Sequence, residues 1–249
     1  VQVINHLFSL TYKENMELCD RHIDQHTIAV GFSTTFWYPN EEMKDYGMGL
    51  IADIIHHMNL KAPQAKLIVG GTNMAEIEFI NKHKKIDMRF LGYSESAVLQ
   101  YLTGNKHEFD FTKSQIIYDK SDGILPGETL TIETARGCIF KCAFCSYEMN
   151  GKKKFDYIKN VEILREELTR NYDDYGITNY IFSDDTFNDS TYKVALIADM
   201  MAKLPFKPRF TSYLRLDLLR RFPEQIGLLK DMGIAGAFFG IESFNYETS

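Results

Sequence analysis

Short apolar runs alternate with helix-like segments along the first part of the chain. Runs such as VQVINH (1–6) and KLIVGG (66–71) are typical of strands in a parallel sheet. The segments between such runs have the amphipathic spacing of helices. We expect strands at 1–6, 27–32, 66–71 and 87–92 and helices at 11–23, 40–60, 73–84 and 94–103. Because such alternation favours parallel sheets with right-handed crossovers, residues 1–105 are predicted to form a Rossmann-like, doubly wound α/β domain.

The alternation stops after residue 105 and resumes at 129. Residues 106–128 sustain no helical period, and their DG and PG pairs are turn signals, so we interpret them as a linker with room for one β-hairpin. Further strands are expected at 129–135, 178–183, 209–214 and 236–241, with helices at 159–173, 190–204 and 217–232. Residues 129–249 are therefore predicted to form the first four strands of a β/α barrel, truncated at the C-terminus.

Composition and charge limit the classes of protein to which this chain can belong. The 249 residues are 45% hydrophobic and 25% charged, which is ordinary for globular domains. A net charge of −6 without a long basic block does not favour nucleic-acid binding, and no apolar run reaches the roughly 18 residues of a membrane span. No secretory leader is visible, and clustered cysteines do not suggest a secreted disulfide framework, so a cytoplasmic location is expected.

The stretch TARGCIFKCAFCSYE (134–148) holds three of the four cysteines, Cys138, Cys142 and Cys145. Thiolates are soft ligands that suit zinc, copper(I) and iron–sulfur clusters. A structural zinc site normally takes four ligands, and no histidine lies between 108 and 249; a redox pair of Cys142 and Cys145 would leave Cys138 without a role. A 4Fe–4S cluster with one iron open to a substrate or cofactor fits better, while Cys19 is expected to be a small core residue.

The run RGCIFKCAFC resembles the cluster-binding loop of the radical S-adenosylmethionine (SAM) superfamily. The resemblance lies in cysteines spaced three then two residues apart, with an aromatic residue, Phe144, before the last. YIFSDDTF and FFGIES resemble the second and fourth strand segments of the subgroup with an N-terminal cobalamin-binding-like domain. GFSTTF, VGG and IDMRFLGYSES resemble segments of that domain. The Asp-x-His-x-x-Gly loop of some cobalamin domains and the second cysteine cluster of methylthiotransferases are not present.

The resemblance implies roles for residues around the cysteines. Cys138, Cys142 and Cys145 would bind the cluster, and Phe144 would lie against the SAM adenine. The position of Asp184 and Asp185 would handle the SAM amino group, and that of Glu242 and Ser243 the ribose or methionine. Arg215, just after a strand, could form a bidentate pair with the SAM carboxylate. A capping turn for the aspartates and a surface position for the arginine are the plainer alternatives.

Four further candidates lie at strand ends of the first domain: Ser33, Thr34, Gly70 and Gly71. Hydroxyl groups and bare backbone at the carboxyl edge of such a sheet can meet a phosphate or nucleotide tail, which here would be that of cobalamin. Ordinary turn chemistry is the alternative reading of the same residues.

The resemblance implies a radical SAM enzyme. It would cleave SAM reductively to a 5′-deoxyadenosyl radical and transfer a methyl group from cobalamin to an unactivated carbon of a small molecule or peptide. An electron donor such as flavodoxin or ferredoxin is implied. Two alternatives remain: a cobalamin-independent radical SAM cyclisation, oxidation or rearrangement, and a non-catalytic metal-binding module.

Overall fold

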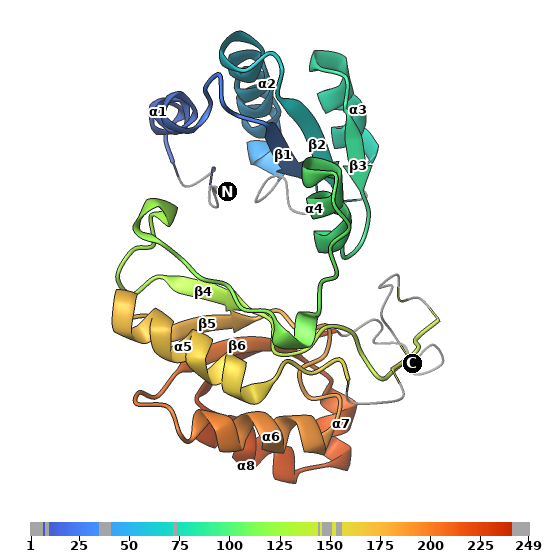
Figure 1. Cartoon of the computed structure of the whole chain (residues 1–249). Coiled ribbons are helices and arrows are strands. Elements are labelled where there is room, and N and C mark those ends of the chain that lie inside the picture. The colour runs from blue at the N-terminus through green and yellow to red at the C-terminus, as the bar shows by residue number, and fades with distance from the viewer. Residues whose placement is uncertain are drawn as a thin grey trace. The chain divides into compact units, whose positions relative to one another are not determined.

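The computed structural model describes residues 7, 10–34, 41–71, 74–143, 145, 151–152 and 156–240 (Figure 1). The chain divides into two compact units, Val1–Phe109 and Asp110–Ser249. The strand expected at 1–6 lies outside the described residues.

The first unit contains a parallel sheet in the order β1-β2-β3. Its elements along the chain are α1 (Tyr12–His22), β1 (Ala29–Ser33), the 3₁₀ turn Glu41–Met43, α2 (Lys44–Lys61), β2 (Lys66–Gly70), α3 (Met74–His83), β3 (Met88–Phe90) and α4 (Glu95–Thr103). Leu67 and Val69 of the central strand are fully buried, in one cluster with Ile55, Met58 and Ile80. Burial of this apolar surface is the main favourable contribution to the stability of the unit.

Cys19 belongs to the core of this first unit. Its thiol is 5% exposed, and burial beside Asp20 raises its pKa to about 11. It therefore stays protonated near neutral pH and behaves as a small apolar residue, as its helical position indicates.

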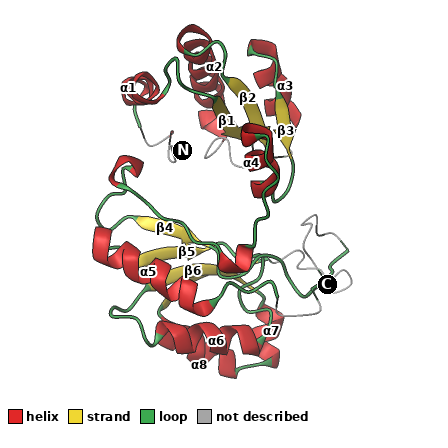
Figure 2. Ribbon diagram, viewed as in Figure 1, coloured by secondary structure: helices red, strands yellow, loops and turns green. Residues whose placement is uncertain are grey.

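The second unit contains a parallel sheet in the order β4-β5-β6-β7. The strands are β4 (Thr129–Ile132), β5 (Asn179–Phe182), β6 (Arg209–Leu214) and β7 (Ile234–Phe239), and the helices are α5 (Val161–Tyr175), α6 (Thr191–Met201), α7 (Leu216–Arg221) and α8 (Glu224–Met232). Helices α5, α6 and α8 lie along one face of this sheet (Figure 2). The predicted α/β class with parallel sheets is confirmed.

An aromatic cluster forms the centre of the second core. The rings of Phe182 on β5 and Phe210 on β6 stack with centroids 4.4 Å apart, and Phe187 packs against both. Alternation along β5 turns Phe182 inward, whereas its neighbour Ile181 is 37% exposed.

The hairpin expected in residues 106–128 is wrong. This segment is described throughout and contains no strand, only the 3₁₀ turns Phe111–Lys113 and Lys120–Asp122. Phe111 contacts two cations, with its ring centroid 4.5 Å from the Arg136 guanidinium carbon and 5.5 Å from Lys159 Nζ. The backbone N–H of Asn160 donates to the Thr112 carbonyl at 2.8 Å, so the segment is bound to the second unit.

The single helix expected at 217–232 is also wrong, because two helices occupy this range. Pro223 has no N–H to donate and disfavours helical geometry in the residue before it. Accordingly, α7 ends at Arg221, Phe222 is non-helical, and α8 begins at Glu224. Gly233 then ends α8 with φ of 95°, where an added Cβ would lie 2.1 Å from the Pro208 carbonyl oxygen. Only glycine fits this turn into β7.

Among the described residues, no helix combines the length and apolar character needed to cross a bilayer.

We predict that Phe182→Ala lowers the free energy of unfolding by about 3–5 kcal/mol, because it leaves a cavity among three packed rings. Urea denaturation of the full chain, followed by far-ultraviolet circular dichroism, measures this change. The matched control is Ile181→Ala on the same strand, which should cost less than about 1.5 kcal/mol because that side chain faces outward. Equal losses in the two variants would contradict the assignment of Phe182 to the core.

Candidate functional site

The cysteine loop begins where β4 ends, at the carboxyl edge of the second sheet. Gly137 takes a φ of 108°, which permits the sharp turn into the loop. Ala135 forms an antiparallel bridge with Ile158, and the Arg136 N–H donates to the Tyr157 carbonyl at 2.9 Å. The chain that leaves the loop therefore pairs with the chain that enters it.

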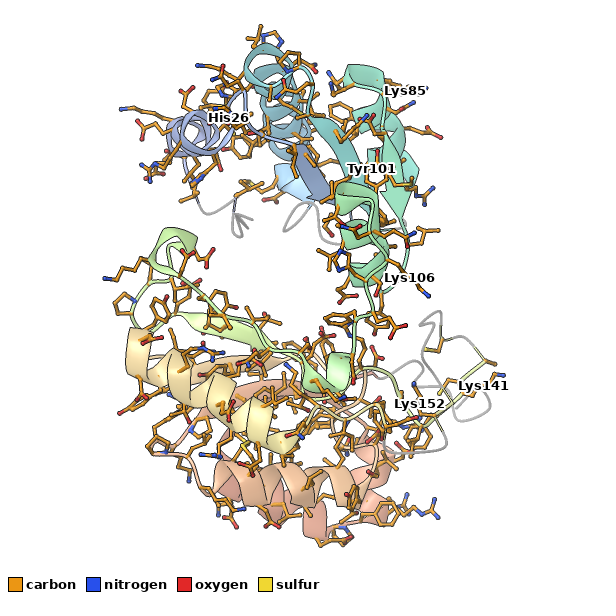
Figure 3. All side chains as sticks on the ribbon, viewed as in Figure 1. His26, Lys85, Tyr101, Lys106, Lys141 and Lys152 are labelled. Carbon is orange, nitrogen blue, oxygen red and sulfur yellow. The ribbon has the colours of Figure 1, made fainter. Side chains whose placement is uncertain are left out.

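The two arms are also joined further along, where the Lys152 N–H donates to the Cys138 carbonyl at 3.0 Å and the Gly151 N–H to the Phe140 carbonyl at 2.8 Å. Figure 3 labels Lys141 and Lys152, one on each arm. These bonds fix the backbone around the first cysteine.

The three clustered cysteines are free thiols that differ in exposure. Cys138 is 9% exposed, whereas Cys142 and Cys145 are half-buried, and the Cys145 N–H donates to the Cys142 carbonyl at 3.1 Å. Across the described part of the chain, no three His, Cys, Asp or Glu side chains gather closely enough to hold a metal, and this includes the three cysteines. As a donor set, three thiolates on one short loop, two of them accessible, fit an iron–sulfur cluster.

Asp184 binds the start of this loop from the end of β5. Its Oδ1 accepts the backbone N–H groups of Thr134 at 2.7 Å and Ala135 at 3.1 Å, and its Oδ2 accepts the Thr134 hydroxyl. The side chain is fully buried. Both oxygens of this candidate for the SAM amino group are thus engaged within the chain.

Lys193 on α6 is a buried cation behind the same loop. Its side chain is 0% exposed, and Nζ donates to the Thr186 carbonyl at 2.7 Å and lies 3.4 Å from Asp184 and 3.3 Å from Asp189. The Tyr157 hydroxyl donates to the other oxygen of Asp189 at 2.7 Å. Burial raises the pKa of Asp189 and Lys193 opposes that rise, so the lysine stabilises the charged form of the carboxylate.

Thr186 extends this network to the first cysteine, because its Oγ1 lies 3.5 Å from Cys138 Sγ. The contact connects the buried charges to a sulfur of the loop. Sequence reasoning missed Lys193, Thr186 and Tyr157. The available signal was a lysine within the apolar run of α6, four residues after an aspartate.

Asp185 is the neighbouring carboxylate with spare acceptor capacity. Its Oδ2 is buried and has no hydrogen-bond partner among the described residues. Burial raises its pKa, and the charges of Asp184 and Glu133 add to that rise, while a backbone hydrogen bond from Gly137 opposes it. A cationic ligand group at this oxygen would relieve an unfavourable environment.

Arg215 follows β6 directly and reaches the loop. Its guanidinium forms a two-bond pair with Asp217, stacks on Phe140 and lies 3.6 Å from Cys142 Sγ. The structure thus brings four candidates to one sheet edge: Asp184, Asp185, Arg215 and the cysteine loop. The expected positions of Phe144, Glu242 and Ser243 lie outside the described residues.

The candidates of the first unit lie together at the ends of β1 and β2. Thr34 is buried, and both its N–H and its hydroxyl donate to the Gly70 carbonyl, at 2.9 and 3.0 Å. Ser33 is exposed, and Gly71 has a φ of 95°. No atom of the described residues lies within 4 Å of a Cβ added to Gly70, so this position is open within that part of the chain.

Residues 132–249 match the family model described as the Radical SAM superfamily. A curated relative, the "Uncharacterized methyltransferase PH0819" of Pyrococcus horikoshii, is 31% identical over 125 residues, which make up 50% of this chain and 26% of that protein.

The fold resembles solved structures of OxsB, described as a cobalamin-dependent S-adenosylmethionine radical enzyme. The apo form matches with a TM-score of 0.58 at 18% identity, over 95% of this chain and 38% of that one. The form with aqua-cobalamin and SAM bound matches with a TM-score of 0.55 at 16% identity, over 94% and 37%. The chain thus spans about a quarter of the curated relative and under two fifths of OxsB.

We predict that Lys193→Met lowers the free energy of unfolding by about 3–5 kcal/mol, because it leaves two carboxylates buried without their cation. Chemical denaturation of the full chain provides the measurement. Lys203→Met, an exposed lysine just after the same helix, is the control and should change stability by less than about 0.5 kcal/mol. If both variants unfolded at the same denaturant concentration, the buried network would not stabilise the fold.

Proposed function

We propose that this chain is part of a radical SAM enzyme that cleaves SAM reductively at a 4Fe–4S cluster. The observation that carries the proposal is the three-cysteine loop at the carboxyl end of β4, in a segment that matches the model of the Radical SAM superfamily. Active sites of β/α barrels lie at that edge of the sheet.

Cys138, Cys142 and Cys145 would hold three irons of the cluster, leaving the fourth open to SAM. When bound, the cluster supplies one electron to the sulfonium of SAM, which yields methionine and a 5′-deoxyadenosyl radical that abstracts a hydrogen atom from substrate. The residues of the chain would bind and orient the cluster and SAM, and they would exclude water from them. The hydrogen bonds from Lys152 and Gly151 and the contact of Thr186 with Cys138 hold the loop in a defined shape for this purpose.

Asp185 is the carboxylate best placed to accept the ammonium group of SAM. One of its oxygens lacks a partner in the described structure, whereas both oxygens of Asp184 already bind the loop or Lys193. We therefore assign binding of the SAM ammonium group to Asp185, and Asp184 would support this role by binding the start of the loop. Roles of Phe144 at the adenine and of Glu242 and Ser243 at the ribose or methionine remain proposals from the resemblance.

Methyl transfer that depends on cobalamin is the reaction we propose to follow. The name of the curated relative and the cobalamin dependence of OxsB support it, as do the open surroundings of Gly70 at the carboxyl end of β2. The alternative is a radical SAM cyclisation, oxidation or rearrangement without cobalamin. Either reaction requires a small-molecule or peptide substrate and a one-electron donor of the flavodoxin or ferredoxin type.

We predict that the protein, reconstituted without oxygen, binds about four irons and four sulfides per chain. Cys142→Ala should abolish reductive SAM cleavage because the cluster loses one of its three ligands. Iron analysis and chromatographic detection of 5′-deoxyadenosine measure both effects. Cys19→Ala, which removes a thiol from the other unit, should leave both unchanged, and full SAM cleavage by Cys142→Ala would overturn the assignment.

A second prediction concerns the first unit. Gly70→Val should weaken cobalamin binding at least about tenfold, because its side chain enters space that the nucleotide tail would occupy. Gly49→Val, at another glycine with open surroundings, is the matched control and should bind as the wild type does. Titration with hydroxocobalamin, followed by the corrin absorption bands, gives the affinities. If the wild type bound no cobalamin, the cobalamin-independent alternative would replace the proposal.

A further inference from the structure

The backbone of Arg215 is held at both its polar groups by one buried side chain. Its N–H donates to Asn188 Oδ1 at 2.8 Å, and its carbonyl accepts from Asn188 Nδ2 at 3.1 Å. Asn188 is fully buried, and its Nδ2 also donates to Gln225, at 3.2 Å. The backbone of Arg215, between β6 and α7, is therefore held in place, and this fixes the position from which its side chain extends.

The guanidinium is fixed as well. Its Nε and Nη2 donate to the two oxygens of Asp217 at 3.0 and 2.8 Å, which is the bidentate geometry that arginine favours with carboxylates. Its guanidinium carbon lies 4.2 Å from the ring centroid of Phe140, within the cysteine loop. These contacts direct the remaining nitrogen, Nη1, at Cys142 Sγ, 3.6 Å away.

These contacts affect the role that the sequence suggested for Arg215, which is a bidentate pair with the SAM carboxylate. A carboxylate of SAM bound through Nε and Nη2 would compete with Asp217 for these two nitrogens. Nη1 donates to neither oxygen of Asp217, and a cysteine sulfur already lies beside it. A cation that donates a hydrogen bond to a ligating sulfur stabilises the extra negative charge of a reduced cluster.

We propose that Arg215 is a positioning residue that donates to the Cys142 sulfur and raises the reduction potential of the cluster. The inference rests on the proposed function, since it assumes that the three cysteines hold iron. Asp217 and Phe140 orient the guanidinium for this contact, and Asn188 orients its backbone. The role is distinct from binding SAM, because it acts on the cluster before SAM is present.

The test is a potentiometric titration of the reconstituted full chain without SAM, with the reduced cluster followed by electron paramagnetic resonance. Arg215→Gln should shift the midpoint to a more negative potential than that of the wild type, with iron content retained. Arg220→Gln is the matched control, because it removes the same charge from an exposed position of α7, and its potential should equal that of the wild type. Arg215→Lys keeps a charge without the planar fork and should give an intermediate shift.

The outcomes separate the inference from the proposed function. If the wild type took up no iron, the proposed function itself would fail. If the wild type held a cluster and both Arg215 variants kept its potential, the inference would be wrong. A loss of SAM affinity at unchanged potential would return Arg215 to the SAM carboxylate. Should Arg215→Gln fail to fold, as judged by circular dichroism, the shift in Arg215→Lys decides the matter.

Discussion

The candidate site depends on the carboxylate of Asp184. This one side chain, at the end of β5, accepts two successive backbone N–H groups where β4 turns into the cysteine loop. Those N–H groups would otherwise be buried without a partner, which is costly in a protein interior. The path of the loop away from the sheet is therefore fixed by a neighbouring strand before any cofactor contributes.

Burying that carboxylate requires a partner for its charge. Lys193 provides it and is shared with Asp189, while the Thr186 carbonyl satisfies a further hydrogen of the same ammonium group. Removing one member of such a buried network is costly, because the remaining charges are left without their partner. Arg215 contacts the loop independently of this network, through Phe140 and Cys142.

Sequence patterns were sufficient for the strands that the structure describes and for the position of the cysteine loop after β4, because apolar runs and residue spacing are local properties. They were insufficient for Lys193, whose burial depends on two aspartates brought near it by tertiary structure. Phe111 was likewise assigned to a linker, since nothing local shows that Arg136 and Lys159 lie close to its ring. The break at Pro223 was predictable from proline chemistry, but the apolar period on both sides of it outweighed that signal.

The complete burial of Lys193 also determines how the site responds to dissolved salt. Mobile ions weaken exposed pairs such as Lys13 with Glu17, but they cannot enter a network whose charged side chains are 0% exposed. The start of the cysteine loop, which Asp184 binds, should therefore keep its shape from dilute buffer to high ionic strength. In the proposed enzyme, a change in turnover across that range would then report the encounter with a charged electron donor or substrate rather than a change at the start of the loop.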